Sequence, residues 1–214
     1  MTALRRVYFF LVALFLAAPL IVVLGVSVNE KQDLAFPPVG FSLAWYAQIF
    51  ADPGWRDPLN GRYAGARGGR WNPPESFPVV YLCASVAVAR AVVLGKLEGQ
   101  PFGPEDLDPA TAPVLVAASV PEDRYVDVVT TRGCSSVGLP ATYPRDRARR
   151  RIGWNRCQPV GQAAWDGGAA GIACRSAAPQ SPPRGEELAW FQRGGGPGLR
   201  RRRTRSFDDW FWPG

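Results

Sequence analysis

The chain has 214 residues, a length that suits one domain of ordinary size with an appendage. It contains no histidine, which excludes Ser-His-Asp and Cys-His catalysis and most zinc sites. The formal net charge of +7 comes from two local runs, 145–151 and 200–205, because without their ten arginines 15 basic residues face 18 acidic ones. We therefore expect two solvated basic runs and no direct nucleic-acid binding, since no motif of that kind accompanies them.

The four cysteines are spread along the chain without a CxxC pair. They are Cys83, Cys134, Cys157 and Cys174. This spacing is typical neither of a metal site nor of a dense disulfide framework. It predicts reduced, mostly buried thiols and no bound metal.

The first predicted element is an apolar helix. Residues 7–28 include no charged side chain, and about 20 apolar residues are enough to cross a bilayer as a helix. Arg5 and Arg6 precede this run, which favours a cytoplasmic N-terminus. The sequence therefore predicts one membrane span at 7–28, which anchors the chain if it inserts.

Residues 15–50 contain the pattern FP-x-x-GFSL-x-WY, which runs from Phe36 to Tyr46. With this pattern they resemble the start of an ABC-transporter permease of the polyamine type. The resemblance defines a permease-like membrane leader at 1–55. After residue 28 no apolar run approaches 18 residues, so the further spans of a permease are missing from this chain.

After residue 57 the pattern changes to that of a mixed α/β domain. Short Val-rich and Ala-rich runs predict strands, and apolar residues at helical spacing predict helices. The expected strands are 77–85, 112–120, 124–131 and 170–178, the expected helices are 86–99 and 157–168, and a further short element is 186–192. Residues 193–214 read as a low-complexity basic tail, flexible and ending in exposed aromatic side chains.

The stretch GRYAGARGGRWNPP, residues 61–74, combines four glycines with three arginines. A glycine-rich backbone lets main-chain N–H groups approach an anion, and arginine matches a phosphate with two parallel hydrogen bonds. No P-loop lysine and no G-x-G-x-x-G motif is present. Composition alone leaves two interpretations, a phosphate-binding loop or an ordinary exposed loop.

Four motifs follow one another along the chain: GGRWNPP (68–74), FPVVYLC (77–83), GIACRSAA (171–178) and GEELAWF (185–191). Their order resembles the RES domain, a family that includes toxins of bacterial toxin–antitoxin pairs. The resemblance covers 57–191 and implies an α/β (α+β) fold akin to ADP-ribosyltransferases. It also implies a cytoplasmic domain that acts on NAD and is neutralised by an Xre-type antitoxin.

The resemblance assigns three catalytic positions. Arg70 would hold the phosphates of NAD or the acceptor, Tyr81 would line the nicotinamide-ribose pocket, and Ser176 would orient the ribose or the attacking group. The glutamate that gives the family part of its name is expected at Val92, and Glu98 is the nearest acid in the sequence.

The same resemblance implies a set of NAD-binding residues around the glycine-rich loop. They are Arg62, Tyr63, Arg70, Trp71 and Asn72. Arg62 and Tyr63 stand in for an arginine and an aromatic residue that the family carries upstream of this loop.

Three functions stay open at this point. The first is a RES-type toxin that cleaves the nicotinamide-ribose bond of NAD, with water, phosphate or a protein side chain as acceptor. The second is a truncated permease component of a polyamine-type importer. The third is a single-span protein whose external domain only binds a partner.

Overall fold

The computed structural model describes residues 12, 15, 57–108, 112–195 and 198–212. The chain divides into two units, 1–53 and 54–214. The predicted span 7–28 and the permease-like leader 1–55 lie outside the described residues, apart from Val12 and Phe15, which are helical. Among the described residues there is no helix long and apolar enough to cross a membrane.

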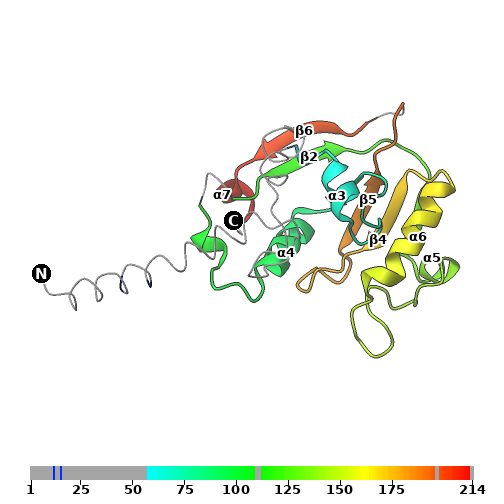
Figure 1. Ribbon diagram of the computed structural model, residues 1–214, viewed down its shortest axis with the longest axis horizontal. Coiled ribbons are helices and arrows are strands. Elements are labelled where there is room, and N and C mark those ends of the chain that lie inside the picture. Colours follow the sequence, from blue (N-terminus) through cyan, green and yellow to red (C-terminus); the bar gives the residue numbers. More distant parts are fainter. Residues whose placement is uncertain (1–11, 13–14, 16–56, 109–111, 196–197, 213–214) are drawn as a thin grey trace, which may run out of the picture. The chain divides into compact units, whose positions relative to one another are not determined.

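The second unit alternates short strands and helices (Figure 1). Its strands are β1 (Val79–Cys83), β2 (Leu115–Ser119), β3 (Tyr125–Val128), β4 (Gly171–Arg175), β5 (Glu186–Phe191) and β6 (Arg200–Arg205). Its helices are α3 (Arg62–Arg67), α4 (Val86–Leu97), α5 (Thr131–Ser136), α6 (Trp154–Asp166) and α7 (Phe207–Trp210), with a 3-10 turn, η2, at Pro104–Asp106. The expected strands and the two expected helices are confirmed, whereas α3 and α5 were not predicted.

Four strands form the main sheet in the order β1-β5-β4-β3. β1, β5 and β4 pair antiparallel, and β3 pairs parallel with β4. Parallel neighbours need a long crossover connection, and the chain supplies one that contains α5 and α6. This topology brings the C-terminal ends of β3 and β4 to the same edge of the sheet.

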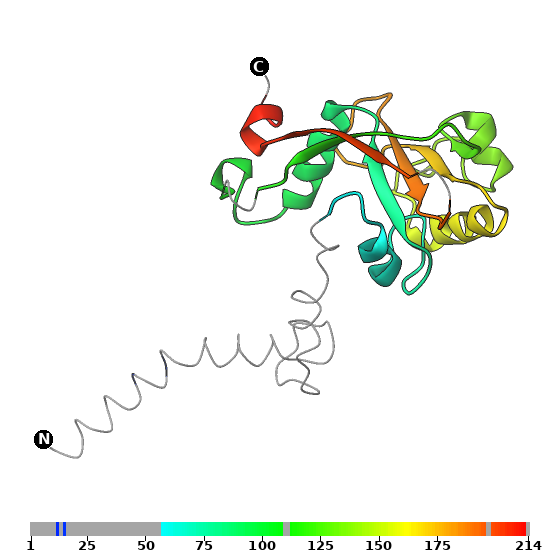
Figure 2. The same cartoon turned by 90° about the horizontal axis from the view of Figure 1, so that it is seen from above.

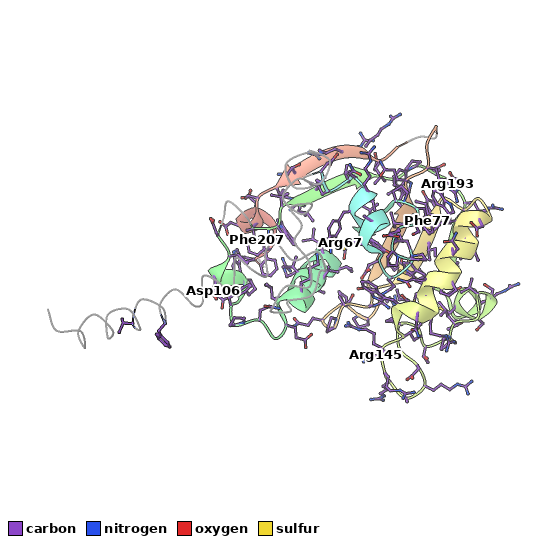
Figure 3. All side chains as sticks on the ribbon, viewed as in Figure 1. Arg67, Phe77, Asp106, Arg145, Arg193 and Phe207 are labelled. Atoms are coloured by element: carbon purple, nitrogen blue, oxygen red, sulfur yellow. The ribbon has the colours of Figure 1, made fainter. Side chains whose placement is uncertain are left out.

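The helix α6 covers one face of this sheet, which we call the core face. Cys157, Gly161 and Ala164 are buried along α6 at helical spacing. Trp165 stacks on Phe77 with ring centroids 4.5 Å apart and also carries the guanidinium of Arg193 over its ring at 3.8 Å. Figure 3 shows Phe77 and Arg193 next to α6. These contacts fix α6 against the strands that carry the candidate site.

The C-terminal segment is structured rather than flexible. β6 pairs antiparallel with β2 in a two-stranded ribbon that leads into α7 (Figure 2). Phe207, Trp210 and Phe211 are buried with Ala112 and pack against α4. Arg90 of α4 donates hydrogen bonds to the carbonyl oxygens of Trp210, at 3.1 Å, and Phe211. The expectation of exposed aromatic side chains is therefore wrong for Trp210 and Phe211, which pack on an apolar helix face, whereas Trp212 is 44% exposed.

Replacing Phe207 with alanine should lower the free energy of unfolding by about 3 kcal/mol, the usual cost of emptying a buried aromatic site. Its ring is 5% exposed and stacks on Phe211 at 4.4 Å. Urea unfolding followed by tryptophan fluorescence measures the change. Phe102→Ala is the matched control, because Phe102 is 43% exposed. Equal stabilities of the two variants would show that α7 does not belong to the folded unit.

Candidate active site

The hydroxyl group of Tyr81 holds the glycine-rich loop in place. The backbone N–H of Trp71 donates to this oxygen at 2.9 Å, and the hydroxyl donates to Oδ1 of Asn72 at 2.9 Å. The buried Asn72 amide in turn donates to the Ala64 carbonyl oxygen at 2.5 Å. Gly69 permits this approach, since a Cβ atom there would collide with the Tyr81 hydroxyl. Tyr81 therefore couples β1 to the loop that carries Arg70.

Tyr81 stays a neutral hydrogen-bond donor. Burial of its hydroxyl raises the pKa of Tyr81 well above the ordinary value, while the Trp71 N–H and the Arg70 guanidinium oppose the shift. The residue as a whole is 38% exposed. Its hydroxyl is nevertheless enclosed by the loop, so the exposed part is the ring. The ring is thus available as a wall for a ligand.

Arg70 points into the protein instead of lying on the surface. Its guanidinium donates to the Ile152 carbonyl oxygen at 3.0 Å, and its charge opposes the rise in the pKa of Cys157 that burial causes. Among the described residues no carboxylate forms an ion pair with it. A half-buried cation without a counter-charge attracts anions more strongly than a solvated one, because screening by water is weaker.

The helix α6 positions the Arg70 loop. The side-chain amide of Gln158 donates to the carbonyl oxygens of Gly69, at 3.0 Å, and Asn72, at 3.3 Å. One turn further on, Gly161 lies against the backbone of Trp71, where a Cβ atom would overlap the carbonyl oxygen. The loop is therefore held between Tyr81 on one side and α6 on the other.

Ser176 follows directly after β4 and is 7% exposed. Its backbone N–H donates to the Gly185 carbonyl oxygen at 2.7 Å, which closes the 177–184 loop. Its hydroxyl donates to Oε1 of Glu187 at 2.5 Å and accepts from the backbone N–H of Ala178 at 3.2 Å. Glu187 was not among the predicted site residues, and it is the direct partner of the family serine position.

Strand register places these groups on the core face. Cys83 of β1, Glu187 of β5 and Cys174 of β4 are aligned in one row across the sheet. Side chains two residues apart on a strand point to the same face, so Tyr81 and Ser176 lie on this face too. Burial, followed by the Glu187 carboxylate, raises the pKa of Cys174 to about 12, and Arg70 opposes the rise. Arg70 and Glu187 therefore shift the pKa of Cys174 in opposite directions.

The other predicted NAD-binding residues divide into two pairs. Trp71 is buried and packs on the ring of Tyr143 with centroids 5.7 Å apart, and the Asn72 amide is committed to Tyr81 and Ala64. Both residues shape the loop. Arg62 and Tyr63 occupy exposed positions on α3. Direct contact of these four residues with a ligand stays a prediction.

Val92 lies on the side of α4 that faces the 176–185 segment. A Cγ atom of Val88 lies 3.0 Å from a Cβ atom built on Gly185, and a Cβ atom built on Gly95 would lie 3.0 Å from Pro179. Residues 88, 92 and 95 share one helix face by their spacing. The position expected for the family glutamate thus borders the Ser176 loop, and it contributes no charge.

A cavity of about 670 Å³ lies beside the polar cluster of the site, which consists of Arg70, Tyr81, Ser176 and Glu187. The cavity borders this polar cluster only in part. Tyr81 and Glu187 line it, whereas Arg70 and Ser176 do not. Leu82, Leu188 and Ala173, which also line it, form a row on the opposite face of the sheet, and residues of the β2–β6 ribbon complete the lining. The lining of the cavity includes Arg205 but is mainly apolar. We assign the site to the polar cluster, because it joins a half-buried cation to several fixed hydrogen-bonding groups, which suits an anionic ligand.

Tyr81 and Ser176 thus lie on one face of the sheet of a mixed α/β fold, and the loop that carries Arg70 is hydrogen-bonded to Tyr81. The chain belongs to the RES domain family, whose family model matches residues 45–205. The match begins inside the permease-like segment and extends to the end of β6, whereas the motifs of the resemblance cover 57–191.

Named relatives come from mycobacteria. The NAD(+) phosphorylase MbcT of Mycobacterium tuberculosis and that of Mycobacterium bovis are each 34% identical over 112 residues, 51% of this chain and 56% of the relative. This chain therefore aligns with little more than half the length of those relatives. The crystal structure of the M. tuberculosis MbcT–MbcA toxin–antitoxin complex matches with a TM-score of 0.57 and 27% identity, over 73% of this chain and 83% of that chain.

Proposed function

We propose that this chain degrades NAD by cleaving the bond between nicotinamide and ribose, with phosphate as the acceptor. The observation that carries the proposal is that Tyr81 and Ser176 share one sheet face and that the Arg70 loop is hydrogen-bonded to Tyr81, with the Arg70 charge unpaired among the described residues. The similarity to proteins named NAD(+) phosphorylase supports phosphate as acceptor.

Each residue has a role in this reaction that its surroundings allow. The Arg70 guanidinium binds the pyrophosphate or the incoming phosphate through charge-assisted hydrogen bonds. The exposed face of the Tyr81 ring borders the nicotinamide-ribose unit, while its hydroxyl keeps the loop in register. The Ser176 hydroxyl is held by Glu187 at the end of β4, where it orients the ribose.

The absence of histidine is compatible with this chemistry. Nicotinamide is a cationic pyridinium in NAD and leaves as a neutral molecule, so its departure needs no general acid. The main tasks of the protein are to hold the dinucleotide in a reactive conformation and to stabilise positive charge on the ribose. Both tasks depend on fixed hydrogen bonds and charges, which the cluster supplies.

We further propose that an antitoxin protein of the Xre type neutralises the chain. The support is the solved complex of the relative MbcT with the antitoxin MbcA. The permease alternative depends on residues 1–55, which lie almost wholly outside the described residues. The domain matched to the RES family extends over 45–205 and favours the toxin.

Controlled expression in bacteria tests the proposed function. Induction of the full chain should lower the cellular NAD concentration and stop growth within a few generations, whereas the Ser176→Ala chain, made to the same level, should do neither. Undiminished NAD in cells that accumulate the folded wild-type chain would refute the proposal.

A further inference from the structure

We propose that Glu187 is the carboxylate of this site: with Ser176 it binds the nicotinamide riboside unit and stabilises the positive charge that develops on the ribose. This inference rests on the proposed NAD cleavage and adds a residue to it. The evidence for it is the position of Glu187 on β5, which differs from that of the preceding residue, Glu186.

The position of Glu187 sets it apart from its neighbour. Glu187 projects to the core face in a row with Cys83 and Cys174, whereas Glu186 points to the opposite face, is exposed and pairs in register with Arg175. The Oε1 atom of Glu187 accepts the Ser176 hydroxyl at 2.5 Å. Among the described residues no donor bonds to its second oxygen, Oε2, and that atom is not among the buried polar atoms that lack a partner. Oε2 is therefore open to a ligand.

The electrostatic influence of Glu187 reaches across the core face. Burial and then the Glu187 carboxylate raise the pKa of Cys83 to about 11, and the same carboxylate contributes to the raised pKa of Tyr143. Glu187 thus places negative charge among partly buried groups, where charge interactions are stronger than in water. Arg70 lies near the same Cys174 and supplies the opposite charge.

This pair of charges matches two charged groups of the substrate. NAD carries a negative pyrophosphate and a positive nicotinamide ring. Arg70 suits the pyrophosphate, and Glu187 suits the nicotinamide ring. Val92, where the resemblance expects an acid, is apolar and borders the same 176–185 loop. Glu187 reaches this region from β5 instead of from α4.

The bond between C1′ of the ribose and the nicotinamide nitrogen breaks, and its electron pair goes to the nitrogen, so nicotinamide leaves neutral. The ribosyl carbon becomes positive, and the Glu187 carboxylate stabilises it while one oxygen stays bonded to Ser176. An oxygen of inorganic phosphate forms the new bond to C1′. The products are nicotinamide and an ADP-ribosyl phosphate.

The test compares Glu187→Gln with Glu186→Gln in the full chain. Glutamine keeps an oxygen that accepts the Ser176 hydrogen bond and removes only the charge, so both variants should unfold at the wild-type temperature. The rate of nicotinamide release at saturating NAD should fall about tenfold to a hundredfold in Glu187→Gln, the usual range for losing one charged contact. The rate of Glu186→Gln should equal that of the wild type. Equal rates in all three proteins would overturn the role of Glu187.

A second measurement separates this inference from the proposed function. If the wild-type chain leaves NAD intact, the proposed function is refuted, and equilibrium dialysis with NAD and NADH then tests Glu187 alone. NADH lacks the positive charge on its nicotinamide ring, so the wild type and Glu186→Gln should bind NAD several-fold more tightly than NADH. Glu187→Gln should lose this preference. Absence of binding, or a preference that survives in Glu187→Gln, would overturn the inference.

Discussion

Replacing Arg70 with alanine is expected to lower the rate of nicotinamide release from NAD about tenfold to a hundredfold. Charge-assisted hydrogen bonds contribute about 1.5–3 kcal/mol each, and about 1.4 kcal/mol corresponds to a factor of ten in rate. Arg70 is the loop cation without a carboxylate partner among the described residues, so no nearby charge compensates for its loss. Release of nicotinamide, separated by chromatography, measures the effect.

Two further variants decide what the Arg70 result means. Arg70→Lys keeps the positive charge but loses the planar fork, so its rate should lie between those of the wild type and Arg70→Ala. Arg132→Ala removes an exposed arginine on α5 and should leave the rate unchanged. If all three variants matched the wild type, Arg70 would not bind an anionic part of the substrate.

Replacing Gly161 with alanine is expected to lower the free energy of unfolding by about 3 kcal/mol or more. The new Cβ atom would overlap the Trp71 carbonyl oxygen, and both groups are fixed by backbone rather than by a flexible side chain. Overpacking of this kind costs about 1–3 kcal/mol and sometimes more, because helix and loop must separate. The Arg70 loop then moves, so nicotinamide release should fall as well.

Gly194 provides the control for Gly161. A Cβ atom at Gly194 meets no atom within 4 Å, so Gly194→Ala should change the free energy of unfolding by less than about 0.5 kcal/mol. Urea unfolding curves of both variants give the comparison. A Gly161→Ala chain as stable as the wild type would mean that α6 does not pack closely on the Arg70 loop.

Much of the domain follows from local sequence patterns. The helix predicted at 86–99 appears as α4, and its N-terminus is capped by the Ser85 hydroxyl, which accepts from the Val88 N–H at 3.3 Å. The helix predicted at 157–168 appears as α6 with a shifted start. Apolar spacing over three turns is a strong signal, and it needs no knowledge of distant contacts.

Elements that depend on distant contacts were harder to predict. α3 lies in a glycine-rich stretch with weak helix propensity, and it is tied down by Asn72 and by packing on β1. β6 contains five arginines and reads as a solvated tail, yet it pairs with β2 over five residues of β2. In both cases tertiary contacts decide the structure, and the local sequence does not contain them.

The site was predictable to the extent that motifs mark it. The order of Arg70, Tyr81 and Ser176 along the chain pointed to one family, and the fold places all three around the core face. Glu187 was missed because two glutamates stand next to each other at the start of β5. Only the register with β1 and β4 decides which of them points toward Ser176.

The most direct test of the account follows NAD by proton NMR in the presence of the purified full chain and inorganic phosphate. We predict that free nicotinamide appears in step with the loss of NAD, that an ADP-ribosyl phosphate forms in equal amount, and that Ser176→Ala abolishes both signals. NAD that stays intact with a folded wild-type chain would contradict the account.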